Sequence, residues 1–235
     1  MTSPFGTSAA MPGTAATDAR VAEFLRGVYG WMFGGLLVTA AVAFAVVGSP
    51  ALVQTLVTNR ILFFGLIIAQ LALVYVVSAK VNTLSPTASA GLFLLYSALT
   101  GITLSLILLV YTRGSIVTAF VSTAGMFGAL ALYGTVTKRS LDGVGSFAMM
   151  GLFGVIIAML VNFFLKSPAL NFVMSVAMVI VFTGLTMYDA QRLKRMALAV
   201  EGPQSGSYAV SGALSLYLNF INLFLTFLRL FGNRR

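Results

Sequence analysis

Seven apolar runs, each long enough to cross a lipid bilayer, constrain the fold of this chain more than any other feature of its sequence. A helix needs about 20 predominantly apolar residues to span the hydrocarbon of a membrane. Because hydrocarbon offers no partners to backbone polar groups, a spanning segment of this kind is helical. The runs lie at about 28–48, 61–79, 88–110, 116–136, 146–165, 169–188 and 209–230. We therefore predict an all-α integral membrane protein with seven transmembrane helices.

The breaks between these runs are short, except for the stretch from Arg192 to Ser207. Short connections make consecutive helices antiparallel neighbours, and they leave no room for a soluble domain. Of the 235 residues, 59% are hydrophobic and only 8% are charged, whereas about a quarter are charged in soluble proteins. We expect a single membrane domain over residues 20–235. Residues 1–19 are rich in Ser, Thr, Ala, Pro and Gly, which predicts a disordered tail.

The basic residues predict the orientation in the membrane, because cytoplasmic loops carry an excess of Lys and Arg. With a cytoplasmic N-terminus and seven crossings, the cytoplasmic segments hold eight basic residues: Arg20, Arg26, Lys80, Lys138, Arg139, Arg192, Lys194 and Arg195. The opposite loops hold three: Arg60, Arg113 and Lys166. This bias predicts a cytoplasmic N-terminus. It also explains the net charge of +9 by the orientation in the membrane, so we do not interpret the charge as a sign of nucleic-acid binding. Because Arg229, Arg234 and Arg235 come at the end of the chain, a re-entrant last helix that returns to the cytoplasm stays an alternative.

Cysteine and histidine are both absent from the chain. Their absence excludes disulfides, thiolate nucleophiles, imidazole bases and ordinary zinc or copper sites, so any bound metal would be a hard cation with oxygen ligands. The pattern Gly143-x-Gly145-x-x-Ala148 matches a loose dinucleotide fingerprint, but it opens a membrane helix instead of following a strand. Tyr188-Asp189 is similar to half of an intramembrane aspartyl protease site, whose second carboxylate no other membrane run supplies. We therefore predict that the chain is not an enzyme.

One acidic residue, Asp189, is continuous with a membrane-length run. The other four acids lie before the first run or in polar breaks: Asp18, Glu23, Asp142 and Glu201. An ionisable group at or near membrane depth is costly and indicates a functional site. A plainer interpretation is an i,i+3 ion pair with Arg192 at the lipid headgroups. However, a carboxylate near a helix C-terminus faces the negative end of the helix dipole, so some group should compensate it.

Two carboxamides, Asn219 and Asn222, lie on nearly one face of the last apolar run. Interhelical hydrogen bonding is the ordinary role of such residues in a membrane protein. Lys80 ends the second run on the same predicted side of the membrane as Asp189. Its ammonium group either extends to the headgroups or compensates the Asp189 carboxylate.

Two C-terminal motifs make the chain recognisable. Residues 184–194 read Gly-Leu-Thr-Met-Tyr-Asp-Ala-Gln-Arg-Leu-Lys, and residues 212–224 read Gly-Ala-Leu-Ser-Leu-Tyr-Leu-Asn-Phe-Ile-Asn-Leu-Phe. Both closely resemble motifs of the Bax inhibitor-1 (YccA-like) family, in its bacterial branch. Shorter matches to the family occur at residues 84–87, 100–105 and 133–139. The resemblance covers roughly residues 20–233, and the N-terminal tail lies outside it.

The resemblance implies a bundle whose last helix is central and a pH-sensitive calcium leak, gated by two aspartates in the last two helices. The first aspartate corresponds to Asp189 and the second to position 219, which is Asn in this chain. Because Asn219 cannot ionise, two coupled carboxylates are excluded and any pH response should involve a single proton. Asn219 can still donate a hydrogen bond to Asp189 and offer its carbonyl oxygen to a cation. The family also pairs its first aspartate with a base near the end of the second helix, for which Lys80 is the nearest match.

We therefore expect a multi-pass protein of the bacterial inner membrane that permits a slow leak of calcium or another hard cation. Asp189 is the predicted cation site and gate, and Asn219 is its hydrogen-bond partner. Lys80, Arg192 and Asn222 are candidate gate partners. No resident cofactor is predicted, and the expected partners are the bilayer and the transported cation. The alternative is a non-conducting interaction protein that modulates a membrane protease or another membrane complex. Asp189 favours conduction, whereas the missing second acid favours this alternative or an altered channel.

Overall fold

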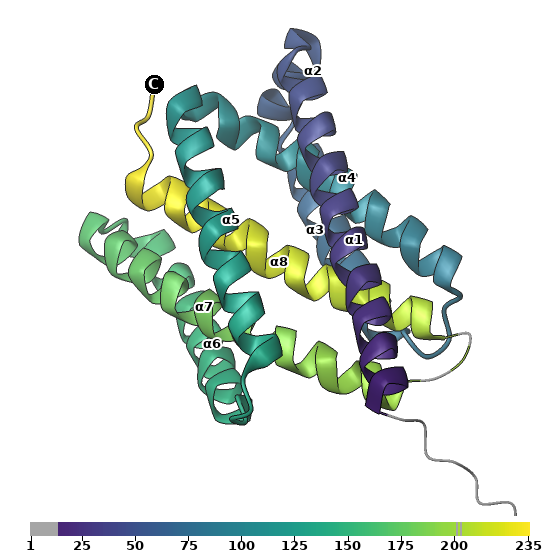
Figure 1. Ribbon diagram of the computed structural model, residues 1–235. Helices are drawn as coiled ribbons and strands as arrows, with labels where there is room; N and C mark the ends of the chain where they lie inside the picture. Colours follow the sequence, from purple (N-terminus) through teal and green to yellow (C-terminus); the bar gives the residue numbers. More distant parts are fainter. Residues whose placement is uncertain (1–13, 201, 203) are drawn as a thin grey trace, which may run out of the picture.

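The computed structural model describes residues 14–200, 202 and 204–235, and Figure 1 shows the helices in chain order. They are α1 (Thr14–Val47), α2 (Pro50–Thr58), α3 (Arg60–Ala79), α4 (Pro86–Val110), α5 (Arg113–Val136), α6 (Asp142–Leu165), α7 (Pro168–Ala199) and α8 (Ser205–Phe231). All except α2 are long and apolar enough to cross a membrane. The described residues form no strand, and their single extended pairing joins Tyr111 to Arg234. The prediction of an all-α bundle with seven membrane-length helices is therefore confirmed.

Local capping signals explain where several helices begin. Pro86 and Pro168 stand at the start of α4 and α7, where the missing proline N–H leaves nothing unpaired. The preceding residues, Ser85 and Ser167, accept hydrogen bonds from backbone N–H groups of the first turn. Thr112 caps α5 in the same way. The polar breaks in the sequence are therefore helix boundaries because their side chains satisfy the exposed ends of the helices.

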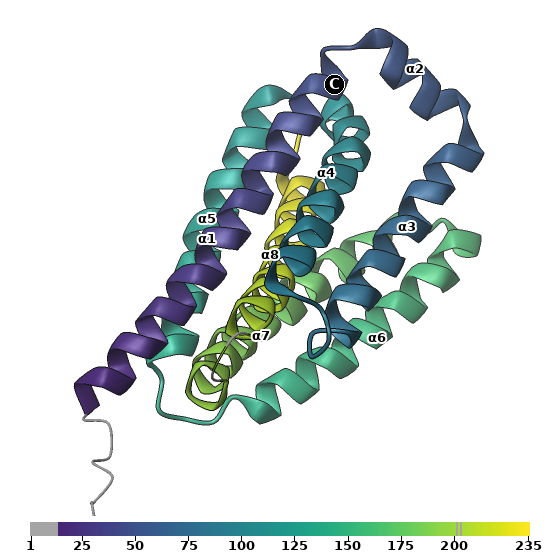
Figure 2. The same cartoon turned by 90° about the vertical axis from the view of Figure 1, so that its right-hand side faces the viewer.

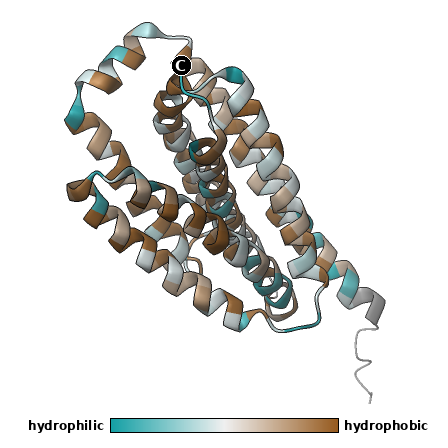
Figure 3. Ribbon diagram, turned by 90° about the vertical axis from the view of Figure 1, so that its left-hand side faces the viewer, coloured by the Kyte–Doolittle hydropathy of each residue, from teal (hydrophilic) through white to brown (hydrophobic). Residues whose placement is uncertain are grey.

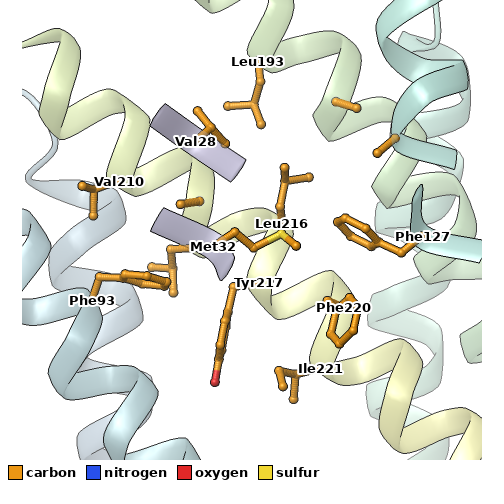
Figure 4. Close-up of a cluster of buried hydrophobic side chains, with 14 of the residues drawn as sticks. Val28, Met32, Phe93, Phe127, Leu193, Val210, Leu216, Tyr217, Phe220 and Ile221 are labelled. Carbon is orange, nitrogen blue, oxygen red and sulfur yellow. The ribbon is translucent and has the colours of Figure 1, made fainter. Parts of the chain in front are cut away.

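Helix α8 runs through the middle of the bundle, as Figure 1 and Figure 2 show. It packs against α1, α4, α5 and α7, whereas α3 and α6 pack chiefly on α4 and α7, respectively. Leu216, Tyr217 and Leu223 of α8 are completely buried. Figure 4 shows the centre of the core, which joins residues of five long helices: Val28, Met32, Phe93, Phe127, Leu193, Val210, Leu216, Tyr217, Phe220 and Ile221. The expectation of a central last helix is confirmed.

Hydrophobic residues make up much of the long helices, as the brown ribbon in Figure 3 shows, and many large apolar side chains are exposed. Phe44, Ile61 and Phe164 are 81%, 86% and 82% exposed, respectively. Extended apolar surface of this kind marks a membrane or protein contact, and on membrane-length helices it contacts lipid chains. The described part of the chain is thus embedded in a bilayer.

Contacts at both ends of α8 establish that it crosses the whole bundle. At its start, the Ser207 hydroxyl donates to the carbonyl oxygen of Leu84 in the α3–α4 loop, at 2.8 Å. Beyond its end, the backbone N–H of Arg235 donates to the carbonyl oxygen of Val110, the last residue of α4, at 2.9 Å. The 25 residues of α4 separate these contacts by about 37 Å, more than the roughly 30 Å of bilayer hydrocarbon. The alternative of a re-entrant last helix is therefore wrong.

This crossing changes the charge balance that predicts the orientation. The three C-terminal arginines join the three basic residues of the loops at the same end of the bundle, which makes six. The bias towards a cytoplasmic N-terminus falls from eight against three to eight against six. The cytoplasmic N-terminus consequently stays a prediction.

The predicted disordered tail, residues 1–19, lies largely outside the described residues. Within it, residues 14–19 are helical, because α1 begins at Thr14. Alanine, which dominates this stretch, is the strongest helix former. Val21 and Phe24, in the next turn, are 9% and 8% exposed and anchor this end of α1 in the core. The tail prediction is wrong for these residues because tertiary packing extends the helix.

The short helix α2 was not expected from the hydropathy pattern. It begins at Pro50 and joins α1 to α3 at the end of the bundle opposite the N-terminus (Figure 2). Its nine residues extend only about 14 Å. It therefore leaves the number of membrane-length helices unchanged.

Candidate cation site

The structure brings Asp189 and Asn219 together between α7 and α8. Asn219 Nδ2 donates a hydrogen bond to Asp189 Oδ2 at 2.7 Å. Asp189 is 9% exposed and Asn219 is 4% exposed, so the pair is buried. A buried carboxylate needs compensation for its lost hydration, and the Asn219 amide supplies part of it. The hydrogen bond predicted from the sequence is present, while the role of the pair in ion conduction stays a prediction.

Arg192 supplies the nearest positive charge within the described part of the chain. Its Nη1 lies 3.6 Å from Asp189 Oδ1, one helical turn away along α7. The Arg192 side chain is 47% exposed and that of Asp189 is 12% exposed, so solvent or headgroups screen much of this attraction. The i,i+3 ion pair of the plainer interpretation is therefore present together with the interhelical hydrogen bond.

Lys80 does not take the place predicted for it beside Asp189. It caps the C-terminus of α3 and is exposed. Helix α3 packs chiefly against α4 and not against α7, which carries Asp189. Among the described residues the cation that pairs with Asp189 is Arg192. The assignment of Lys80 as the compensating base is therefore not supported by the packing of its helix.

Asp189 and Asn219 line a cavity of about 410 Å³ between α6, α7 and α8. Four further residues with polar side-chain groups line it: Tyr188, Arg192, Ser215 and Asn222. The remaining walls are largely apolar, with Met149, Leu152 and Phe182 among the lining residues. A small set of polar groups on an otherwise apolar wall is typical of a binding site for a small ligand or ion.

The carboxamides of this cavity keep their oxygen atoms for a ligand. Asn219 uses Nδ2 to bond Asp189, and Asn222 uses Nδ2 to bond the carbonyl oxygen of Leu218 at 2.8 Å. Each Oδ1 is left without a protein donor in the described part of the chain. Hard cations such as Ca²⁺ take carboxylate and carbonyl oxygens as ligands. No group of three His, Cys, Asp or Glu side chains converges among the described residues, so a cation here would rely on one carboxylate, carboxamide oxygens and water.

Close packing holds the segment of α7 that leads to Asp189. Gly134 of α5 lies so near this segment that an added Cβ atom would overlap the carbonyl oxygen of Met187. Because glycine has no side chain, it lets two helix backbones approach closely. Such packing matters in a membrane, where the hydrophobic effect does not drive helices together. The position of Asp189 relative to α8 thus depends on the backbone contact between α5 and α7.

We expect Gly134→Ala to destabilise the protein, because α5 must move away from α7 to admit the new methyl group. Overpacking of this kind costs about 1–3 kcal/mol. The control is Gly128→Ala on the same helix, where an added Cβ meets nothing within 4 Å. Thermal unfolding of the purified proteins measures both effects. Equal midpoints for the two variants would contradict this account of the helix contact.

A polar cluster beyond Asp189 was missed by the sequence reasoning. Gln191 Nε2 donates to the carbonyl oxygen of Arg139 at 2.8 Å, and Gln191 Oε1 accepts from the backbone N–H of Leu141 at 2.9 Å. Arg195 makes a bidentate pair with Asp142, at 3.0 and 2.6 Å. Gln191 and Arg195 lie four residues apart and therefore on one face of α7. This spacing is the sequence feature from which a shared polar contact could have been predicted. These contacts fix the end of α7 to the α5–α6 loop and to the first residue of α6.

The comparisons with known proteins agree with this architecture. A family model described as Inhibitor of apoptosis-promoting Bax1 matches residues 21–235. Inner membrane protein YbhL of Escherichia coli (strain K12) is 53% identical over 220 residues, which are 92% of this chain and 94% of that protein. An uncharacterized protein of Borreliella burgdorferi is 44% identical over 215 residues, 91% of this chain and 93% of that protein. An uncharacterized protein of Deinococcus radiodurans is 41% identical over 217 residues, 92% of each chain.

Proposed function

We infer the function of this chain from the family to which it belongs, the Bax inhibitor-1 family of multi-pass membrane proteins. We propose that the protein conducts a slow leak of calcium or another hard cation through the cavity between α6, α7 and α8. In this proposal Asp189 is the cation site and gate, and Asn219 and Asn222 provide the neighbouring carbonyl oxygens. The protein requires no resident cofactor and performs no catalysis in this role.

The observation that carries the proposal is the arrangement of oxygen atoms on one cavity wall. The carboxylate of Asp189 lies beside two carboxamides whose nitrogens are already engaged. One carboxylate with neutral oxygens binds a divalent cation weakly, since affinity rises with the number of charged ligands. Weak binding is compatible with conduction, because a conducted ion must both enter the site and leave it.

The test is calcium flux into proteoliposomes that contain the purified full-length protein. We expect entry of calcium above the rate in protein-free vesicles prepared from the same lipids. Flux at the protein-free rate would reject conduction and would favour the second candidate, a non-conducting protein that modulates a membrane protease or another membrane complex. One observation favours that candidate: both carboxylate oxygens of Asp189 already face protein partners, Asn219 and Arg192.

We propose that the protein lies in the bacterial inner membrane with a cytoplasmic N-terminus. The relative from Escherichia coli is named an inner membrane protein, and the orientation follows the excess of basic residues at the N-terminal end of the bundle.

The orientation can be tested with single cysteines in this cysteine-free chain. Ser205 and Asn233 stand near opposite ends of α8, so cysteines at these positions should behave oppositely towards an impermeant thiol reagent. In intact cells we expect Ser205→Cys to resist labelling and Asn233→Cys to react. The reverse pattern would invert the orientation, and labelling of both would contradict the full crossing of α8.

A further inference from the structure

The two ends of the bundle differ sharply in charge. The end opposite the N-terminus carries six basic residues: Arg60, Arg113, Lys166, Arg229, Arg234 and Arg235. The acids in the described part of the chain all lie towards the other end, at the start of α1, the start of α6 and the cytoplasmic-side half of α7 in the predicted orientation. The end opposite the N-terminus is therefore a strongly positive surface without Asp or Glu side chains among the described residues.

Two cavities open at this positive end, on either side of the first turns of α7. The first, of about 480 Å³, lies between α6, α7 and α8 and is lined by Lys166, Asn171 and Arg229. The second, of about 470 Å³, is lined by Asn171, Arg229 and Arg234. Arg229 and Asn171 line both, so the two cavities share one cation and one carboxamide.

Contacts with neighbouring segments hold the chain that carries these basic residues in place. The Arg234 guanidinium lies 6.0 Å from the ring centroid of Tyr111, within reach of a cation–π interaction. Its neighbour Asn233 accepts a backbone hydrogen bond from Thr112 at 3.0 Å, which ties the end of the chain to the α4–α5 loop. Lys166 caps α6 with a φ of 50°, a left-handed conformation that is uncommon for lysine.

Asn171 adds an oriented hydrogen-bond donor to these basic residues. Its Oδ1 accepts a hydrogen bond from Asn162 Nδ2 at 2.9 Å, which fixes the orientation of the carboxamide. Its own Nδ2 makes no hydrogen bond to the described residues and remains for a ligand. The N-terminus of α7 begins nearby at Pro168, where the helix dipole favours negative charge.

We propose that this pair of cavities binds the phosphate headgroup of an anionic phospholipid. Guanidinium and ammonium groups with a carboxamide donor match phosphate oxygens, and basic pockets between membrane helices recognise lipid headgroups. Phe163 and Phe172 line the first and second cavity and are 75% and 63% exposed. They offer apolar surface to the acyl chains of the same lipid, which a free phosphate would not use. The site does not depend on cation conduction, and in the predicted orientation it lies in the outer leaflet of the membrane.

The test is the thermal stability of the purified full-length protein in a neutral detergent, titrated with three probes. A ligand that binds the folded protein alone raises its unfolding temperature. We expect a saturable rise with phosphatidylglycerol and none with phosphatidylcholine or inorganic phosphate. An equal rise with inorganic phosphate would overturn the lipid assignment, and equal curves for the two lipids would overturn the anion site.

Two variants locate the site on the protein. Arg229→Gln removes the shared cation, and Lys166→Asn removes a charge while keeping a residue that tolerates the left-handed conformation. Both side chains are exposed, so neither change disturbs the core. Each should raise the half-saturating concentration of phosphatidylglycerol about fivefold, the factor that corresponds to roughly 1 kcal/mol per basic residue.

The matched control is Arg60→Gln, which removes a cation from the same end of the bundle but outside both cavities. Its half-saturating concentration should equal that of the unmodified protein. A fivefold increase in Arg60→Gln as well would mean diffuse attraction to the positive surface, and unchanged values in all three variants would place the lipid elsewhere. Either result would reject the proposed site.

Discussion

Asp189→Asn is expected to lower calcium leak through the reconstituted protein by roughly tenfold or more. A tenfold change corresponds to only about 1.4 kcal/mol, and an amide offers no negative charge to a hard cation. The variant should still fold, because an amide at this position can hydrogen-bond with Asn219 and removes the need to bury a charge. Calcium flux into proteoliposomes, with matched protein content, measures the effect.

The matched control for this prediction is Asp142→Asn. Asp142 is the acid that pairs with Arg195 at the start of α6, and it does not line the cavity. Its replacement should leave the flux close to that of the unmodified protein. Equal flux through Asp189→Asn and the unmodified protein, with both variants folded, would reject Asp189 as the cation site.

The second large effect is expected from Asn219→Asp. This change would put two carboxylates in the contact where Asn219 now donates to Asp189 at 2.7 Å. Like charges at this separation share a proton and titrate as a coupled pair. The pH dependence of the leak should therefore change from one single-proton step to a broader curve with two steps, because repulsion between the carboxylates separates the two deprotonations. Flux measured over a series of pH values gives the number of steps and the width of the curve for each protein.

Asn222→Asp provides the matched control, because it adds an acid to the same cavity without the contact to Asp189. The Asn222 amide bonds the carbonyl oxygen of Leu218 in its own helix. We expect less broadening of the pH curve for this variant than for Asn219→Asp. If the unmodified protein already shows a two-proton transition that Asn219→Asp leaves untouched, position 219 is not the titrating partner of Asp189.

The number of membrane-length helices could be predicted from the sequence because bilayer thickness fixes their minimum length. Their ends were less predictable. The run predicted at 169–188 is part of α7, which continues to Ala199. Beyond Asp189 this helix is held by Gln191 and Arg195, whose partners in the α5–α6 loop and at the start of α6 lie 50 to 53 residues away in sequence. The hydropathy of the sequence carries no information about such polar contacts, so it could not predict how far α7 extends.

The pairing of Asp189 with Asn219 was predictable because two features converge on it. Asp189 is the acid attached to a membrane run, and both positions fall in motifs of one family. For a peripheral helix such as α3, the sequence carries no comparable signal of its contacts with helices that are distant in the sequence. The short connection between α3 and α4 predicts that they are neighbours, but the sequence does not show which other helices α3 contacts, so it could not exclude Lys80 as a partner of Asp189.

The C-terminal arginines misled the sequence interpretation for a physical reason. The rule for basic loops treats each charge as a topological signal, which made a re-entrant last helix attractive. In the structure the contacts of α8 at opposite ends of α4 require a full crossing. Arg229 and Arg234 then line cavities with Lys166 or Asn171, a placement that the proposed lipid site explains.

The central claim, that a cation binds at Asp189, is tested most directly by infrared difference spectroscopy of the full-length protein with and without calcium. A carboxylate that ligates calcium changes its stretching frequencies. We expect a calcium-dependent carboxylate band in the unmodified protein and in Asp142→Asn, and its loss in Asp189→Asn. The same band in Asp189→Asn, at unchanged intensity, would contradict the claim, because the cation would then bind to another acid.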